Sequence, residues 1–138
     1  MIIDATNHIA GRIASLAAKS ALLGESVEII NCEKAYITGS RENVLAKYKR
    51  KRAMGAPATG PFFPRQSHMM LKRIIRGMLP YKTDRGLKAF KRIKCHHGVP
   101  ESLKNKKPNA LSLEGIAKVP NLRMISIGEI SGQLGAKQ

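Results

Sequence analysis

Cysteine and histidine are the residues of this chain that could bind a metal ion. Cys32 stands by itself, and Cys95, His96 and His97 follow one another directly. Zinc sites use ligands at characteristic short spacings, whereas adjacent side chains of a strand point to opposite sides. No such spacing occurs here, and a free cysteine at the end of a strand behaves as a small buried apolar residue. We therefore expect no metal ion in this protein.

A nucleotide could bind at the turn after the first predicted strand, residues 5–11. Phosphate-binding turns contain G-x-G-x-x-G or end in Gly-Lys-Ser/Thr, because bare backbone amides must approach the phosphates. This turn has a single glycine, Gly11, and no lysine. We therefore expect no nucleotide cofactor. We interpret Gly11 as a point where a helix packs closely on the sheet or another backbone segment approaches.

The acidic residues could support general acid–base catalysis only if two of them met in a cleft. They are scattered instead: Asp4 ends a predicted strand, Glu33 begins a turn, and Asp84 is placed to cap a helix. His8 lies near a predicted helix N-terminus. A histidine at such a position more often helps to cap the helix than polarises a substrate. The sequence therefore predicts no catalytic residue, no enzymatic activity and no small-molecule substrate.

Lysine and arginine dominate the chemistry of the chain. There are 25 of them against 9 acidic residues, a net charge of +16. Residues 47–107 hold 18 basic and 2 acidic side chains, so this segment supplies the whole excess. A surplus of this size repels itself in a compact chain, and its confinement to one segment indicates a surface for a polyanion.

RNA is the polyanion that we expect, because phosphate neutralisation dominates such binding. Arginine can donate two hydrogen bonds to a phosphate or stack on a base, and lysine acts as a point charge. The candidate RNA-binding residues are Lys47, Lys49, Arg50, Lys51, Arg52, Arg65, Lys72, Arg73, Arg76, Lys82, Arg85, Lys88, Lys91, Arg92, Lys94, Lys104, Lys106 and Lys107.

Two phenylalanines, Phe62 and Phe63, lie in a proline- and glycine-rich segment, residues 55–64, that cannot form a helix or a central strand. They could stack on unpaired bases, since proteins that bind single-stranded RNA use aromatic platforms. The simpler interpretation is that they pack this loop onto the protein, because the chain contains no RNP-like motif.

Length and composition indicate a single domain, residues 1–138. The chain has no tryptophan and only six other aromatic residues, which suits a small aliphatic core. Its apolar runs are too short to cross a membrane. Two cysteines far apart and no signal peptide at the start predict a reduced, cytoplasmic protein.

The first thirty residues predict a strand, a helix and a second strand. Residues 1–4 are apolar, and Asn7 is placed to cap a helix that ends at Gly24. Residues 26–31 are rich in β-branched side chains, which favours a strand. This β-α-β unit requires parallel pairing and a right-handed crossover.

Two further helices carry much of the positive charge. The spacing predicts one helix over about residues 41–54. The helix dipole stabilises the basic run 47–52 near its C-terminal end by only about 0.3–1 kcal/mol per cation. A second helix is expected over about residues 68–78, capped by Ser67. Its predicted inner face consists of Met70, Leu71, Ile74, Ile75 and Met78, and its outer face of Lys72, Arg73 and Arg76.

The remainder of the chain is predicted to alternate short elements with loops. A short helix is expected from Asp84 to about Phe90, and a third strand over residues 93–95. Residues 98–120 contain three prolines and are expected to be mostly loop. A fourth strand over residues 122–127 is followed by a short helix.

Three blocks of sequence resemble one family, the ribosomal protein L-thirteen family of the large subunit. The blocks are residues 4–15; residues 31–34 followed by Thr38-Gly39-Ser40 and Lys47-Tyr48; and Arg76-Gly77-Met78-Leu79-Pro80 followed by Gly86 and Phe90-Lys91-Arg92-Ile93-Lys94. They cover roughly residues 4–95 in the family's order. Ala10 and Cys32 depart from it, where leucine and alanine are usual.

The resemblance implies a fold and a role. The fold would be α/β, a three-layer α/β/α domain with a four-stranded, mainly parallel sheet. The role would be that of a structural constituent of the large ribosomal subunit that binds large-subunit ribosomal RNA, contacts neighbouring ribosomal proteins and supports assembly. The tail, residues 122–138, resembles the archaeal and eukaryotic branch, and the short length favours an archaeal type.

Overall fold

The structure is a computed structural model that describes residues 1–106, 108 and 123–136. Its elements are β1 (Ile2–Asp4), α1 (Ala10–Leu22), β2 (Val27–Ile30), the 3-10 helix η1 (Cys32–Lys34), β3 (Tyr36–Thr38), α2 (Arg41–Ala53), α3 (Ser67–Gly77), α4 (Asp84–Lys91), β4 (Ile93–Cys95), η2 (Glu101–Leu103), β5 (Met124–Ser126) and α5 (Ile127–Gln133). The predicted helices and strands are present, with ends shifted by a few residues.

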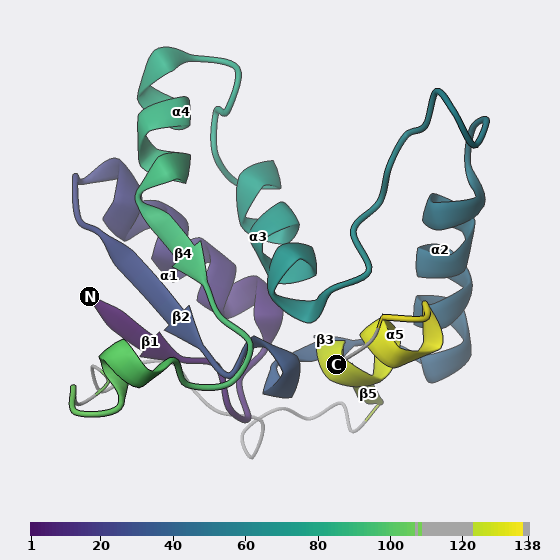
Figure 1. Ribbon diagram of the computed structural model, residues 1–138, viewed down its shortest axis with the longest axis horizontal. Helices are drawn as coiled ribbons and strands as arrows, with labels where there is room; N and C mark the ends of the chain where they lie inside the picture. The colour runs from purple at the N-terminus through teal and green to yellow at the C-terminus, as the bar shows by residue number, and fades with distance from the viewer. Residues whose placement is uncertain (107, 109–122, 137–138) are drawn as a thin grey trace.

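The larger sheet has three parallel strands in the order β1-β2-β4 (Figure 1). Ile3 pairs with Ile29, and Ile29 pairs with Cys95. The helix α1 joins β1 to β2, so the predicted β-α-β unit is confirmed. Parallel neighbours need such a crossover because both strands must run in the same direction.

The predicted fourth strand forms but belongs to a different sheet. Its residues 124–126 are β5, which pairs antiparallel with β3, and Ile37 lies opposite Ile125. The prediction of four strands in one mainly parallel sheet is therefore wrong for the described residues. The strand β3 was not predicted from the sequence.

The helices α1, α3 and α4 share one layer over the parallel sheet. The helix α1 packs against both α3 and α4, so these helices cannot lie on opposite faces of the sheet. The expected three-layer arrangement is thus not confirmed by the described residues. The helices α2 and α5 flank the small sheet instead, and Figure 1 shows α2 apart from α1, joined to α3 by a long raised loop.

One hydrophobic core connects these elements. Alanines on the inner face of α1 allow α3 to pack closely, and Ile13, Leu71, Ile75 and Ile93 are completely buried there. The small sheet contributes Ile125 to the same core. Because the buried residues form one cluster, the parallel sheet and the small sheet hold the basic helices in fixed positions.

Three predicted caps are assigned to the wrong residue. Asn7 lies outside α1 with φ 57°, and Ile9 occupies the cap position. Ser67 is the first residue of α3 and is buried. In α4 the cap is Thr83, whose Oγ1 accepts a hydrogen bond from the Gly86 amide at 3.3 Å.

The inner face of α3 is narrower than predicted. Met70, Leu71 and Ile75 are buried, whereas Ile74 is only half-buried. Met78 lies beyond the last helical residue, Gly77, and its side chain is 43% exposed. Met78 follows the end of the helix and its side chain faces solvent. The prediction that Met78 belongs to the inner face is therefore wrong.

Close packing by glycine occurs at Gly86 and not at Gly11. A Cβ added at Gly86 would lie 2.0 Å from the Pro80 carbonyl oxygen, so the turn before α4 is built against this residue. A Cβ at Gly11 would meet no atom within 4 Å. The interpretation of Gly11 as a point of close approach is therefore wrong.

Replacing Gly86 with alanine is expected to destabilise the protein by about 1–3 kcal/mol or more, because backbone atoms must move to admit the methyl group. Gly77→Ala is the matched control, since a Cβ there meets no atom within 4 Å. It should be neutral or stabilise by up to about 1 kcal/mol. Urea unfolding of both variants measures the difference, and equal stability would contradict the packing of the turn against Gly86.

Candidate nucleic-acid interface

The basic run at the end of α2 separates into two groups. Lys47, Lys49 and Arg50 are exposed, and none has a side-chain partner among the residues that the structure describes. The Lys51 ammonium lies 5.5 Å from the centre of the Tyr48 ring, and Arg52 bonds within the protein. The first three are thus the cations of this run that make no side-chain contact within the described residues.

Two predicted RNA ligands instead hold the C-terminal helix α5. Arg52 Nη1 donates to the Leu134 carbonyl at 2.6 Å, and Arg65 Nη1 donates to the Gly135 carbonyl at 3.5 Å. Ser131 Oγ donates back to the Arg65 carbonyl at 2.7 Å. The last carbonyls of a helix lack partners within it, and a nearby cation is favoured by the helix dipole. These arginines therefore act first as caps.

Two more arginines bond to the backbone in the same way. Arg92 Nη1 donates to the Ala21 carbonyl at 3.3 Å, in the last turn of α1. Arg73 Nη1 donates to the Phe62 carbonyl at 2.8 Å and so ties the loop to α3. The guanidinium has five N–H donors, so one internal bond leaves others for a phosphate.

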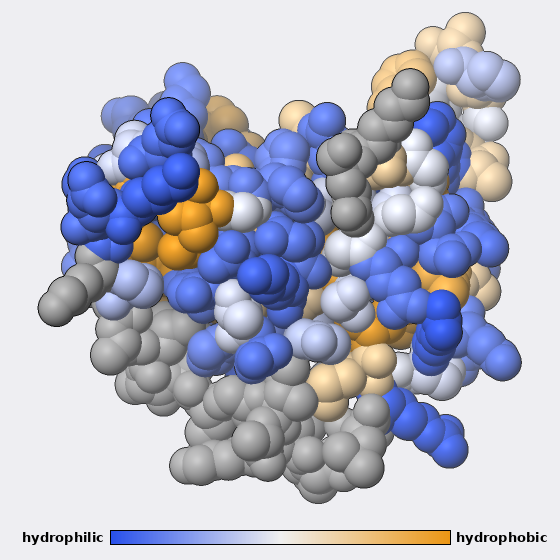
Figure 2. Space-filling view, turned by 60° about the horizontal axis from the view of Figure 1, so that its bottom comes forward, coloured by the Kyte–Doolittle hydropathy of each residue, from blue (hydrophilic) through white to orange (hydrophobic). Residues whose placement is uncertain are grey.

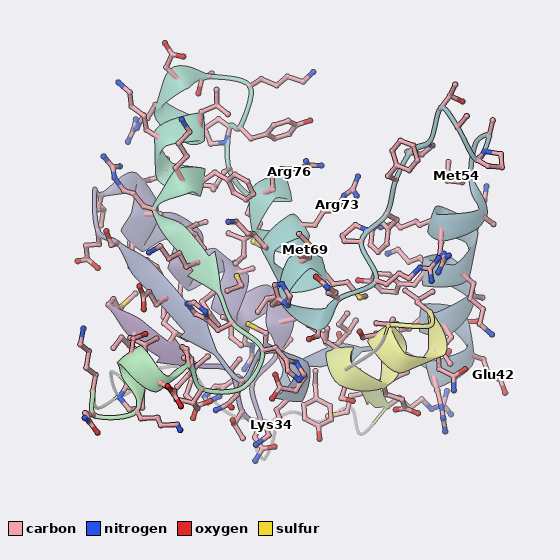
Figure 3. All side chains as sticks on the ribbon, viewed as in Figure 1. Lys34, Glu42, Met54, Met69, Arg73 and Arg76 are labelled. Carbon is pink, nitrogen blue, oxygen red and sulfur yellow. The ribbon has the colours of Figure 1, made fainter. Side chains whose placement is uncertain are left out.

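Cations along α3 lie over aromatic rings. The Lys72 ammonium is 5.1 Å from the centre of the Phe90 ring, and Arg76 Cζ is 5.1 Å from that of Tyr81. Arg73 Cζ is 5.0 Å from the centre of the Phe63 ring. Figure 3 shows Arg73 and Arg76 leaving α3 on the same side. The rings hold these cations in fixed positions without neutralising them.

The cations of α4 and the turn before it face solvent. Lys82, Arg85, Lys88 and Lys91 are exposed and have no side-chain partner in the described part of the chain. They form a second accessible group, separated from α2 by α3 and the loop. Figure 2 shows a face of the molecule on which hydrophilic residues predominate, with hydrophobic residues visible as separate patches.

The remaining candidates are weakly paired or lie outside the described residues. Lys94 Nζ is 3.9 Å from Glu28 Oε1, and Lys104 Nζ is 3.9 Å from Glu101 Oε1. Exposed ion pairs at this distance contribute little to stability, so the lysine can readily exchange the carboxylate for another anion. Lys106 is exposed, and Lys107 lies outside the described residues.

The two loop phenylalanines have different surroundings. The Phe63 ring packs edge-on against Tyr48, with ring centres 5.7 Å apart, and lies against the core. The Phe62 side chain is 71% exposed. The packing interpretation is therefore confirmed for Phe63 but not for Phe62, whose ring is open to solvent.

The cysteines and histidines do not assemble a metal site. Within the described residues no three His, Cys, Asp or Glu side chains are placed to hold a metal ion. A side-chain hydrogen bond between the Cys32 thiol and Cys95, together with burial, raises the pKa of Cys32 above its usual range. Burial and the nearby His97, His96 and Lys72 lower the pKa of His68. Cys32 is a free, buried cysteine, and its raised pKa disfavours the thiolate that binds metals.

Asp4 has a structural role at the end of β1. Its Oδ1 accepts hydrogen bonds from the Thr6 amide at 2.9 Å, the Thr6 hydroxyl at 2.7 Å and Asn31 Nδ2 at 3.0 Å. Burial alone would raise the pKa of Asp4, but these bonds and the charge of Lys34 hold it below its usual value. The carboxylate fixes the turn and shows no arrangement for acid–base chemistry.

The sequence did not reveal the apolar partners of the cations. Met69, Arg73 and Arg76 lie on one face of α3, and their spacing of four and three residues is the signal that could have indicated a shared surface. Phe90 and Pro64 join this surface from elsewhere in the chain. Pro64 is only three residues before α3, but no local pattern could have placed Phe90 beside this helix.

Replacing Arg52 with alanine is expected to loosen α5 and cost about 1–3 kcal/mol, because the Leu134 carbonyl loses a charged donor. Amide hydrogen exchange should accelerate at residues 134–136. Arg50→Ala removes the same charge from an exposed neighbour and should leave that exchange unchanged. Equal exchange in the two variants would mean that Arg52 does not cap α5.

No described helix is both long enough and apolar enough to cross a membrane. The fold and the surface together define a small α/β protein with two groups of exposed, positively charged side chains. The chain belongs to the family described as Ribosomal protein L13, whose sequence profile matches residues 1–102. The resemblance noted in three blocks of the sequence is thereby confirmed.

Archaeal relatives match the chain over nearly its whole length. A protein of Methanosarcina barkeri is 42% identical over 137 residues, which cover 99% of this chain and 98% of the relative. A protein of Methanococcus maripaludis is 40% identical over 143 residues, again covering 99% and 98%. For a protein of Methanopyrus kandleri the identity is 39% over 136 residues, covering 97% and 86%. Each is named large ribosomal subunit protein uL13.

Proposed function

We propose that this protein is a structural, non-enzymatic constituent of the large ribosomal subunit. It binds large-subunit ribosomal RNA, lies among neighbouring ribosomal proteins and supports assembly of the subunit in the cytoplasm. The chain acts as a single domain, residues 1–138, whose RNA-binding segment is residues 47–107. Membership of the ribosomal protein L13 family and the names of the archaeal relatives support this role.

The observation that carries the RNA-binding proposal is a set of exposed cations that have no side-chain partner among the residues described by the structure. The set has two parts, one on α2 and one on α4 and the turn before it. Its members are Lys47, Lys49, Arg50, Lys82, Arg85, Lys88 and Lys91. A large excess of like charge destabilises the free protein by self-repulsion, and a phosphate backbone removes that cost by neutralising it.

Four arginines have both a structural and an electrostatic role in this proposal. Arg52, Arg65, Arg73 and Arg92 fasten α5, the loop and α1 through backbone carbonyls. They still contribute positive potential to the RNA-binding surface. Replacing these arginines is therefore expected to lower the stability of the fold and, to a smaller extent, the affinity for RNA. Replacing the lysines of α4 should lower the affinity for RNA alone.

Sedimentation of a cell lysate tests the proposed role. The protein should run with the large subunit, and washing with high salt should release it, because its contacts are largely ionic. A variant with Lys82, Lys88 and Lys91 replaced by glutamine should remain folded and dissociate at lower salt. A protein that stays in the unbound fraction at low salt would contradict the proposal.

A further inference from the structure

A groove beside α3 combines apolar and cationic side chains. It measures about 300 Å³ and is lined by Pro64, Met69, Lys72, Arg73, Arg76 and Phe90. Met69 is 49% exposed although it is a large apolar residue, and Phe90 is half-buried. Figure 3 shows Met69 on the side of α3 from which Arg73 and Arg76 extend. The apolar floor is thus open to an outside group.

The cations of the groove are held in place before any ligand arrives. Phe90 positions the Lys72 ammonium, and Tyr81 positions the Arg76 guanidinium, at 5.1 Å in each case. The Phe62 carbonyl and the Phe63 ring fix Arg73. Among residues 1–106, 108 and 123–136, no carboxylate lines the groove, so these residues do not neutralise its charge. A ligand therefore meets oriented cations and loses less affinity to ordering them.

A larger hollow nearby has less free charge. It measures about 580 Å³, lies between the end of α2 and the loop, and is lined by Arg52 and Arg65 among others. Both arginines already donate to carbonyls at the end of α5. The groove beside α3 is thus the better candidate for a specific anionic ligand.

The shape and chemistry of the groove favour one kind of occupant. A volume near the lower end of small-molecule sites admits a single base but not a stacked helix. Unpaired bases stack on aromatic rings and arginine planes, while their phosphates bind nearby cations. An acidic peptide would use the cations but would gain little from the floor formed by Met69, Pro64 and Phe90.

We propose that this groove binds one unpaired nucleotide of RNA. The base lies against Met69 and Phe90, and Arg73 and Arg76 bind the phosphates on either side. The proposal rests on the proposed RNA-binding function and adds a position where the protein reads an unstacked base. The surface thereby distinguishes a bulged or looped RNA from a regular duplex, which phosphate contacts alone cannot do.

Two RNA hairpins with equal numbers of phosphates test the proposal on the full-length protein. One is fully paired, and the other contains a single bulged 4-thiouridine. We expect the bulged hairpin to bind more tightly by roughly 5- to 100-fold, the range that stacking of one base supplies. Irradiation should crosslink the 4-thiouridine to a peptide that contains Met69 or Phe90.

Variants separate the groove from the remainder of the surface. Met69→Ser and Phe90→Leu should lose the preference for the bulge while binding the paired hairpin as before. Leu87→Ser is the matched control, because Leu87 is 46% exposed on α4 and does not line the groove. It should keep the preference. Met69→Ser changes an exposed residue, so it remains informative if Phe90→Leu fails to fold.

The outcomes distinguish the groove from the general function. Equal binding of both hairpins by the unaltered protein would overturn the nucleotide site and leave RNA binding intact. Binding of neither hairpin, with no association with the large subunit, would overturn the proposed function itself. If Met69→Ser weakens binding of poly-glutamate and keeps the bulge preference, the groove belongs to an acidic protein segment and the proposal is wrong.

Discussion

Replacing Ile75 with alanine is expected to destabilise the protein by about 2–5 kcal/mol, the usual cost of emptying a buried aliphatic site. Ile75 is fully buried on the inner face of α3, in the core that α1 shares. Alanine would leave a cavity that the alanine-rich face of α1 has no larger side chain to fill. A typical domain is stable by only about 5–15 kcal/mol, so this loss is a large share of the total.

The neighbouring residue Ile74 provides the control for this prediction. Ile74 is half-buried, so Ile74→Ala removes the same atoms from a site that already borders solvent. Its cost should be clearly smaller, and urea unfolding with equal slopes in both variants gives the comparison. A larger loss for Ile74→Ala than for Ile75→Ala would mean that α3 is rotated relative to the orientation described.

Replacing Lys47, Lys49 and Arg50 together with glutamine is expected to weaken binding to ribosomal RNA and to flatten its dependence on salt. Each phosphate contact that is lost lowers the slope of log affinity against log salt by about 0.7–0.9, because fewer counterions are released. Three lost contacts would lower it by about 2–3. Fluorescence titrations with purified ribosomal RNA over a range of salt concentrations measure the slope.

The choice of residues and the control follow from the structure. Arg52 is left unchanged because it caps α5, and Lys51 because it lies against Tyr48, so their replacement would mix folding with binding. Lys19, an exposed lysine of α1 outside the basic segment, is the control, and Lys19→Gln should leave the slope unchanged. An unchanged slope in the triple variant would remove the end of α2 from the RNA-binding surface.

The sequence by itself determined the parts of this protein that depend on neighbouring residues. The β-branched run over residues 27–30 and the helix between the first two strands follow from local preferences, and the structure confirms both elements. The confinement of positive charge to residues 47–107 is a property of composition, so it too could be read directly. The three blocks that resemble the ribosomal protein L13 family were sufficient to identify it.

Only the tertiary structure decided which cations remain free and which strands pair. Arg52 meets the carbonyl of Leu134, 82 residues further along the chain, and no local pattern encodes that bond. The strand β5 pairs with β3 rather than joining the parallel sheet, because a strand's partner is set by the packing of the whole core. Phe90 likewise reaches the groove beside α3 only because α1 holds α3 and α4 in one layer. The local sequence determines the helices, the strands and the distribution of charge. Contacts between distant segments arise because their apolar side chains are buried in one common core.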